Sequence, residues 1–193
     1  MKIILASQSG VRKQILDKYN IDSEVIVSNV DEDEVKQSLL TEGADPLSIS
    51  KNLAEIKSIK VSSKQPDRLV LGADSVISLN GELINKPNSR EDALKILKKL
   101  NNSKHYLISS VCISRNGSMI WNFTDKASLI MKNFFIEDLK IYLSKISDET
   151  LYAYNVYQIE GEGRNLFSEI NGNEETIMGL PVKKIKEYLE TIK

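Results

Sequence analysis

Apolar and polar residues alternate along the chain in two patterns, one typical of strands and the other of helices. Short apolar runs predict strands, and apolar residues that recur three and four positions apart predict amphipathic helices. The predicted strands cover residues 2–6, 24–28, 69–79, 82–85, 106–114, 119–123 and 126–131. The predicted helices cover residues 11–19, 46–61, 90–100, 136–145 and 182–192. A loop-rich stretch at 147–163 precedes the segment 165–170 and a turn at 171–173.

Two Asn-Gly dipeptides mark tight turns between neighbouring strands. Asn80-Gly81 and Asn116-Gly117 each lie between apolar runs. A type I′ turn needs positive φ at both central positions, which these residue types tolerate. Since such hairpins are as frequent as helical crossovers, the predicted fold class is α/β, with a mixed, largely antiparallel twisted sheet flanked by helices.

The composition excludes several classes of protein but does not indicate an activity. The 193 residues are 41% hydrophobic and 27% charged, which is ordinary for one domain, or for two lobes that share a core. The net charge is −1, and the lysines and arginines are spread along the sequence rather than concentrated in a block. No nucleic-acid surface is therefore predicted, although a small basic pocket for phosphates is allowed. Cys112, the single cysteine, cannot form an internal disulfide. No apolar stretch reaches membrane-spanning length and the N-terminus is too short for a signal sequence, so we expect a cytoplasmic protein.

An aspartate interrupts the most apolar of the predicted strands. Asp74 lies within the segment 69–79, with apolar residues on both sides. An ionised, unpaired carboxylate beside a core costs several kcal/mol, so such a residue usually has a cation, a metal or a chemical task nearby. Gly72 and Ala73 precede it and leave room for a ligand to approach the backbone. The alternative is structural: an aspartate at a strand end that accepts hydrogen bonds from loop amides.

Polar residues at the start of the first predicted helix favour phosphate binding. Ser9 is a candidate N-cap, and helix-start amides, serine hydroxyls and the guanidinium of Arg12 converge there. The segment lacks a Walker GKS or GKT sequence, so an ordinary capped helix stays an alternative.

Other charged residues are ambiguous when each is read alone. The acidic run that contains Glu32 is typical of a solvated face, although Glu32 could share a cation with Asp74 and a triphosphate. Lys57 and Lys86 each read as surface lysines. His105, the single histidine, has no second ligand at metal-binding spacing, which favours a structural or hydrogen-bonding role. With no Ser-His-Asp order and no nucleophilic cysteine context, acyl-transfer hydrolysis is not expected.

Taken in order, the motifs resemble those of the Maf family of nucleoside triphosphate pyrophosphatases over nearly the whole chain. ILASQSGVRKQIL resembles the family's LASxSPRRxxLL, and LGADSVISLNGELINKP resembles its most specific segment, GADTVVxxxGxxxxKP. VSNVDEDE, NLAEIKS and EDALKILKKLNNSKHYLISSVCI follow in family order, and NVYQIEGEGRNLFSEINGNEETIMGLPV is similar to the closing segment. The YQxEG motif resembles that of a divergent branch of the Maf family. The resemblance implies a Maf/ITPase-like fold with two lobes around a central cleft.

The resemblance also implies a reaction and the residues that carry it. The reaction is hydrolysis of a standard, non-standard or modified nucleoside triphosphate to the monophosphate and pyrophosphate, with a divalent cation, Mg²⁺ or Mn²⁺. Asp74 falls on the general base, and Glu32 and Asp74 fall near the metal; whether Asp74 mainly takes the proton or holds the metal stays open. The implied substrate contacts are Ser9, Arg12, Lys57, Lys86 and Glu160. Homodimers are usual among the relatives, and the family is linked to restraint of cell division.

Two departures from the family pattern concern the phosphate site and the late loop. Gly10 and Val11 replace the family's proline and first arginine, so a phosphate contact is lost unless Lys13 or Arg164 replaces it. Residues 152–155, Tyr-Ala-Tyr-Asn, replace a D-K-A-G segment.

A third departure concerns substrate choice. Glu160 stands where many relatives have a glutamine that reads the base. An ionised carboxylate accepts hydrogen bonds but cannot donate them, so we expect a different base preference.

Two other functions are weighed against hydrolysis of a triphosphate. A nucleotide-binding regulator of cell division with little turnover fits the lost arginine and the altered late loop, but the retained Asp74, Lys86 and Arg12 argue against it. Phosphomonoesterase chemistry through an aspartyl nucleophile is disfavoured, because no second aspartate lies two residues after Asp74.

Overall fold

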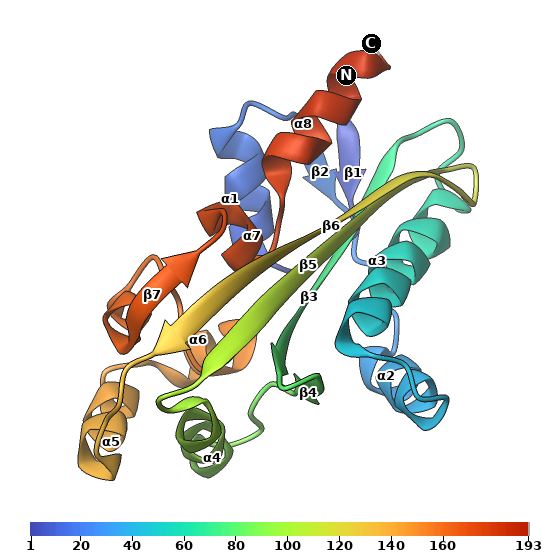
Figure 1. Cartoon of the computed structure of the whole chain (residues 1–193). Coiled ribbons are helices and arrows are strands. Elements are labelled where there is room, and N and C mark those ends of the chain that lie inside the picture. Colours follow the sequence, from blue (N-terminus) through green and yellow to red (C-terminus); the bar gives the residue numbers. More distant parts are fainter. Residues whose placement is uncertain (193) are drawn as a thin grey trace.

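A twisted sheet runs diagonally through the molecule, with helices against both of its faces (Figure 1). The computed structural model describes residues 1–192, apart from the side chains of residues 153 and 154. In this part of the chain the strands are β1 Ile3–Leu5, β2 Ser23–Val25, β3 Val70–Leu79, β4 Glu82–Ile84, β5 Lys104–Arg115, β6 Ser118–Met131 and β7 Phe167–Asn171. Their order is β2-β1-β3-β5-β6-β7, with β4 beside β3. β1 pairs in parallel with β2 and β3 and the remaining pairings are antiparallel, which confirms the predicted mixed sheet.

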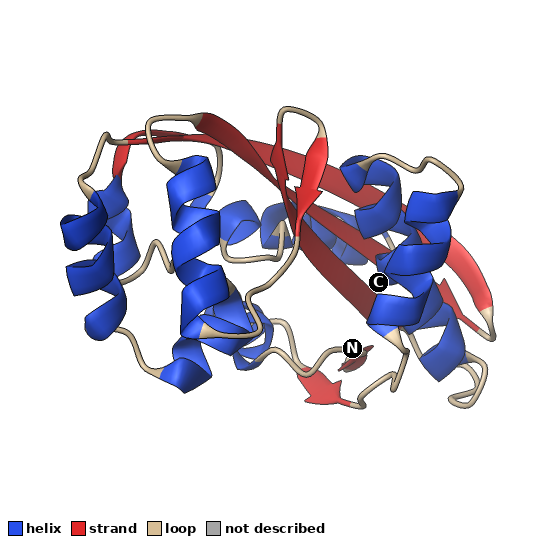
Figure 2. Ribbon diagram, turned by 90° about the horizontal axis from the view of Figure 1, so that it is seen from below, coloured by secondary structure: helices blue, strands red, loops and turns tan. Residues whose placement is uncertain are grey.

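The helices flank the long strands on either side (Figure 2). They are α1 Gly10–Lys18, α2 Glu32–Thr41, α3 Pro46–Ser62, α4 Arg90–Leu100, α5 Ile136–Ser144, α6 Asp148–Tyr154, α7 Glu174–Ile177 and α8 Val182–Thr191, with a 3₁₀ turn at Glu162–Leu166. Figure 1 shows α3 on one side of β3 and β5, and α1, α7 and α8 on the other. None of the helices described is long and apolar enough to cross a membrane.

Two buried clusters lie one after the other along the sheet. One contains Ala73 and Val111 and packs beneath α1 and α8, whereas the other contains Ile77 and Leu107 and packs beneath α4 and α5. Each cluster buries the apolar stripe of its helices, which removes apolar surface from water. These clusters are the cores of the two lobes.

The hairpins form where the sequence predicts them. Asn80 and Gly81 have φ of 52° and 85°, and Asn116 and Gly117 have φ of 51° and 77°, as a type I′ turn requires. The two short strands expected after the second turn are one strand, β6, which pairs with β5 along nearly its whole length. The strand expected at 24–28 is shorter, because β2 ends at Val25.

Helix α2 is absent from the prediction, which placed only a solvated acidic run there. The acidic residues form its first turn, where negative charge favours the positive end of the helix dipole. Asp31 caps it by accepting a hydrogen bond from the Glu34 amide at 3.0 Å. No residue of α2 is buried, and its apolar residues, Val35, Leu39 and Leu40, form too short a stripe to predict a helix. In the stretch expected to be loop-rich, α6 likewise begins at an N-cap, Ser147.

Gly72 makes room for a helix rather than for a ligand, contrary to the prediction. A Cβ at this position would lie 2.1 Å from the carbonyl oxygen of Ala54 and 2.7 Å from the amide nitrogen of Ser58, both on α3. The missing side chain therefore allows α3 to lie directly on β3, which brings the residues of α3 close to Asp74.

Candidate active site

The site lies at a gap in strand pairing along one edge of β3. β1 pairs with β3 at Val70 and Leu71, and β4 pairs with it only from Ile77 onward. Between these pairings, Arg12 Nη1 donates to Ala73 O at 3.0 Å on this edge. Ser50 Oγ, on α3, donates to Asp74 O at 3.1 Å. A cavity of about 660 Å³ opens along this edge. Its lining includes residues of α1 and of α3, which lie on opposite sides of β3.

One buried lysine joins two carboxylates on the α3 side of the cavity. Lys57 Nζ donates to Asp74 Oδ1 at 2.8 Å and lies 2.8 Å from Glu32 Oε1. Lys57 is 4% exposed and Asp74 5% exposed, so the expectation of a surface lysine at 57 is wrong. Asp74 Oδ2 is buried and has no hydrogen-bond partner among the described residues. Burial raises the pKa of Glu32, but Lys57 and Lys36 outweigh it, and the net pKa is below the usual value.

Ser9 and Arg12 lie on the other side of the gap, where α1 begins. Ser9 is the N-cap, as predicted, and its Oγ accepts a hydrogen bond from the Arg12 amide at 3.4 Å. The Arg12 side chain donates to Ser7 Oγ at 3.1 Å, to Ala73 O at 3.0 Å, to Ser75 Oγ at 3.2 Å and to Gly179 O at 2.9 Å. These bonds use four of its five N–H groups and leave one for a ligand.

Two further lysines add positive charge to the cavity. Lys86, at the end of β4, lines the wall, as does Lys36 from α2. Lys86 is exposed, as expected of a surface lysine, yet partial desolvation, followed by repulsion from Arg12, lowers its pKa below the usual value. Lys36 is a residue that sequence reasoning missed, because the helix that carries it was not predicted.

The cavity lining also includes apolar side chains and a further carboxylate. Ile77, Leu107 and Tyr157 belong to this lining together with Glu160. Tyr157 Oη is 3.0 Å from His105 Nε2, which gives the buried histidine the hydrogen-bonding role that was predicted. Burial lowers the pKa of His105 to about 4.

The cavity brings together every site residue predicted from the sequence. These are Ser9, Arg12, Glu32, Lys57, Asp74, Lys86 and Glu160. The two replacements expected for the lost arginine are not among its lining residues: Lys13 pairs with Asp17 on the surface of α1, and Arg164 pairs with Glu174 at 2.6 Å. In the altered stretch 152–155, Tyr152 and Asn155 line the cavity, and the side chains of 153 and 154 lie outside the described residues.

The fold and the cavity define a class of protein: an α/β protein with a cleft in which basic side chains, suited to phosphate groups, lie beside carboxylates. The family model described as "Maf-like protein" matches residues 2–192. The chain therefore belongs to the Maf family, as its motifs indicate.

Curated relatives match almost the full length of the chain. A protein of Pelagibacter ubique (strain HTCC1062) named nucleoside triphosphate pyrophosphatase is 68% identical over 100% of this chain and 98% of its own. A protein of the same name from Ruegeria pomeroyi is 36% identical over 97% of this chain and 94% of its own. A 7-methyl-GTP pyrophosphatase of Brucella abortus biovar 1 is 34% identical over 94% of this chain and 92% of its own.

Proposed function

We propose that the protein hydrolyses a nucleoside triphosphate to the monophosphate and pyrophosphate, with Asp74 as the general base. The observation that carries this proposal is the buried Asp74 carboxylate, held by Lys57 at the cleft and with one oxygen that has no hydrogen-bond partner among the described residues. The names of the relatives, nucleoside triphosphate pyrophosphatases in two cases, support the same reaction.

The residues of the cleft fit the demands of phosphoanhydride cleavage. The reaction needs neutralisation of charge on phosphate oxygens, in-line positioning of water and a base, and little covalent chemistry from the protein. Arg12, Lys36 and Lys86 line the cavity and supply positive charge for the triphosphate, and Ser9 lies beside them at the start of α1.

A divalent cation, Mg²⁺ or Mn²⁺, fits the carboxylates of this site. Asp74 and Glu32 would hold it, because both lie against one ammonium group and Asp74 Oδ2 has no other partner among the described residues. The part of the chain that the structure describes has no cluster of three or more acidic, histidine or cysteine ligands. Phosphate oxygens and water would complete the coordination, as is common for Mg²⁺, and the bound ion would stabilise negative charge on the leaving pyrophosphate.

Glu160 favours a base whose edge carries hydrogen-bond donors. The N1–H and N2–H₂ groups of guanine point the same way and can both donate to one carboxylate. A 7-methylated guanine adds a positive charge, which a carboxylate also attracts. We therefore propose guanine nucleotides, standard or 7-methylated, as the preferred substrates; the name of the Brucella relative agrees with the second.

The proposal has further parts. We propose that residues 1–193 form a single domain, that the protein acts in the cytoplasm, and that its substrate is a small molecule, with no role for nucleic acid or membrane. Homodimers, usual in the family, are included as well.

The decisive experiment measures pyrophosphate release from a panel of triphosphates. The purified protein with Mg²⁺ or Mn²⁺ is given GTP, 7-methyl-GTP, ATP, CTP, UTP and dTTP. We expect the fastest turnover on a guanine substrate and no turnover with EDTA. Binding without turnover on every substrate would favour the regulator of cell division, and a pyrimidine preference would overturn the proposed role of Glu160.

A further inference from the structure

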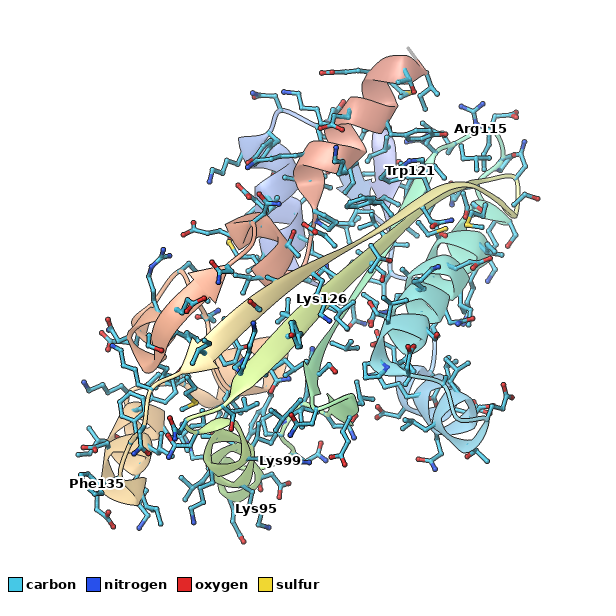
Figure 3. All side chains as sticks on the ribbon, in the orientation of Figure 1. Lys95, Lys99, Arg115, Trp121, Lys126 and Phe135 are labelled. Carbon is cyan, nitrogen blue, oxygen red and sulfur yellow. The ribbon has the colours of Figure 1, made fainter. Side chains whose placement is uncertain are left out.

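A row of polar residues crosses the sheet between the two apolar clusters. Ser75 on β3 is paired with Ser109 on β5, and Ser109 is paired with Asp125 on β6. The neighbouring residues on the same face belong to one cluster or the other, so the row marks the boundary between the lobes. Lys126, labelled in Figure 3, follows Asp125 and shows where the row meets β6.

Hydrogen bonds connect this row to Arg12, and each of these bonds has one possible donor and one possible acceptor. Ser109 Oγ donates its single proton to the Thr176 carbonyl at 2.7 Å, so it accepts from Ser75 Oγ, also at 2.7 Å. Ser75 Oγ in turn accepts from Arg12 Nη2 at 3.2 Å. Each hydroxyl proton thus has one assigned acceptor, and a chain of this kind polarises its members cooperatively.

The other end of this series of hydrogen bonds holds the segment 176–179, which also binds Arg12. Thr176, which is fully buried, donates its hydroxyl to Asp125 Oδ2 at 2.6 Å. Three residues later, Gly179 O accepts from Arg12 Nε at 2.9 Å. A Cβ on Gly179 would lie 3.1 Å from Ser75 Oγ, so this segment packs tightly against the row.

We propose that Ser109, Thr176 and Asp125 are positioning residues for catalysis, and that they act through Arg12. They hold the guanidinium so that its remaining N–H faces the triphosphate. They also hold α7, whose last residue, Ile177, lines the cavity. Asp125 acts from the third strand of the row, without lining the cavity. The proposal rests on the phosphate role of Arg12 proposed above.

The test is a double-mutant cycle on kcat/KM for the best triphosphate of the panel. Ser109→Ala is expected to lower kcat/KM about fivefold, the scale of one lost hydrogen bond between neutral groups, but less than about twofold in an Arg12→Lys background, since coupled residues are not additive. The matched control is Ser114→Ala. Ser114 is a buried serine of the same strand in a similar 2.7 Å hydroxyl pair with Ser58, and it does not line the cavity. Its loss should lower the melting temperature without changing kcat/KM.

A second pair of variants keeps the proposal testable if Ser109→Ala does not fold. Thr176→Val removes the hydroxyl that donates to Asp125 at similar volume and should also lower kcat/KM, by about tenfold. Thr176→Ser restores the hydroxyl and should return activity to within about twofold.

The outcomes separate this inference from the proposed function. If Arg12→Lys keeps full kcat/KM, the phosphate role of Arg12 fails. If Arg12→Lys loses activity but Ser109→Ala and Thr176→Val do not, the positioning role alone is overturned. An equal loss from Ser109→Ala in both backgrounds would also overturn it, because the chain would then not act through Arg12.

Discussion

Lys57 Nζ lies 2.8 Å from Asp74 Oδ1 and holds Glu32 at the same distance, so one ammonium group joins β3, α2 and α3. The residue is almost fully buried. Removing one member of a buried ion pair leaves the other charge uncompensated, which costs more than the pair itself contributes.

We therefore expect Lys57→Met to lower the free energy of unfolding by about 3 kcal/mol. The methionine fills a similar space but leaves Asp74 and Glu32 facing each other without a cation. Lys51→Met, on the exposed side of the same helix, is the matched control and should change stability little. Urea denaturation of the two variants measures the difference, and equal stabilities would show that Lys57 is not needed to compensate these carboxylates. Excess Mg²⁺ should restore part of the loss in Lys57→Met.

Asp74→Asn separates the chemical role of the carboxylate from its structural one. The amide retains an acceptor for Lys57, and Glu32 still pairs with that lysine, so the fold should persist. Loss of the general base should lower kcat at least about 100-fold. Pyrophosphate release measures the rate, and circular dichroism and thermal melting check the fold. Near-normal turnover in a folded variant would remove Asp74 from catalysis.

The helix that carries Lys57 shows how far the sequence could predict this site. The buried residues of α3 include Ser50, Leu53, Ala54, Lys57 and Val61, spacings of three and four that place Lys57 within the apolar stripe. The periodicity thus contained the signal, although a lysine read alone is typical of a surface. Its partners are supplied by β3 and by α2, and their arrangement depends on tertiary packing.

Local sequence patterns were sufficient to predict those features that depend only on neighbouring residues. The Asn80-Gly81 turn and the Ser9 cap depend on residues within a few positions of one another, and both form as predicted. By contrast, the contact of Arg12 with Gly179 joins residues 167 positions apart, and no local pattern encodes it. Family motifs gathered the site residues, whereas Lys36 on the unpredicted α2 was missed.

Lys86 should make kcat/KM fall at alkaline pH, and an arginine at this position should shift that fall to higher pH. Its pKa is lowered, first by desolvation in the cavity and then by Arg12, so it loses its proton at a lower pH than a free lysine. Since the neutral amine no longer attracts phosphate, kcat/KM should fall as pH rises through this pKa. In Lys86→Arg the fall should shift to higher pH, because arginine stays charged.

The control for this profile is a lysine outside the cavity. Lys99→Arg, on α4 (Figure 3), should leave the pH profile unchanged. Lys86→Ala should lower kcat/KM about tenfold or more at neutral pH, as expected when a charge-assisted contact is lost. Unchanged values would place Lys86 outside the site.

His105 should make the protein less stable in mild acid. Its pKa is about 4 in the folded protein and about 6.5 in the unfolded chain, so the unfolded state binds more protons between these values. Stability is therefore fully present above pH 6.5 and is lost as pH falls toward 4. Between pH 7 and pH 5 the loss from this residue is about 2 kcal/mol.

His105→Gln should remove that pH-dependent loss while keeping a polar partner for Tyr157. Urea denaturation of both proteins at pH 7 and pH 5 measures it. Equal losses in the wild type and the variant would mean that protonation of His105 does not limit acid stability.

Glu160→Gln should change which triphosphate the protein prefers, and do so without a large loss of overall activity. A carboxylate accepts hydrogen bonds from the N1–H and N2–H₂ donors of guanine, whereas an amide both donates and accepts and so tolerates uracil and thymine. Glu160 lines the cavity but is not one of the carboxylates that pair with Lys57, so the chemical step should persist. We expect the ratio of kcat/KM for GTP or 7-methyl-GTP to that for UTP or dTTP to fall at least about tenfold, the value of about one hydrogen bond to a charged group. Glu162→Gln, two residues on and outside this cavity, is the matched control. A substrate profile identical to that of the wild type would show that Glu160 does not contact the base.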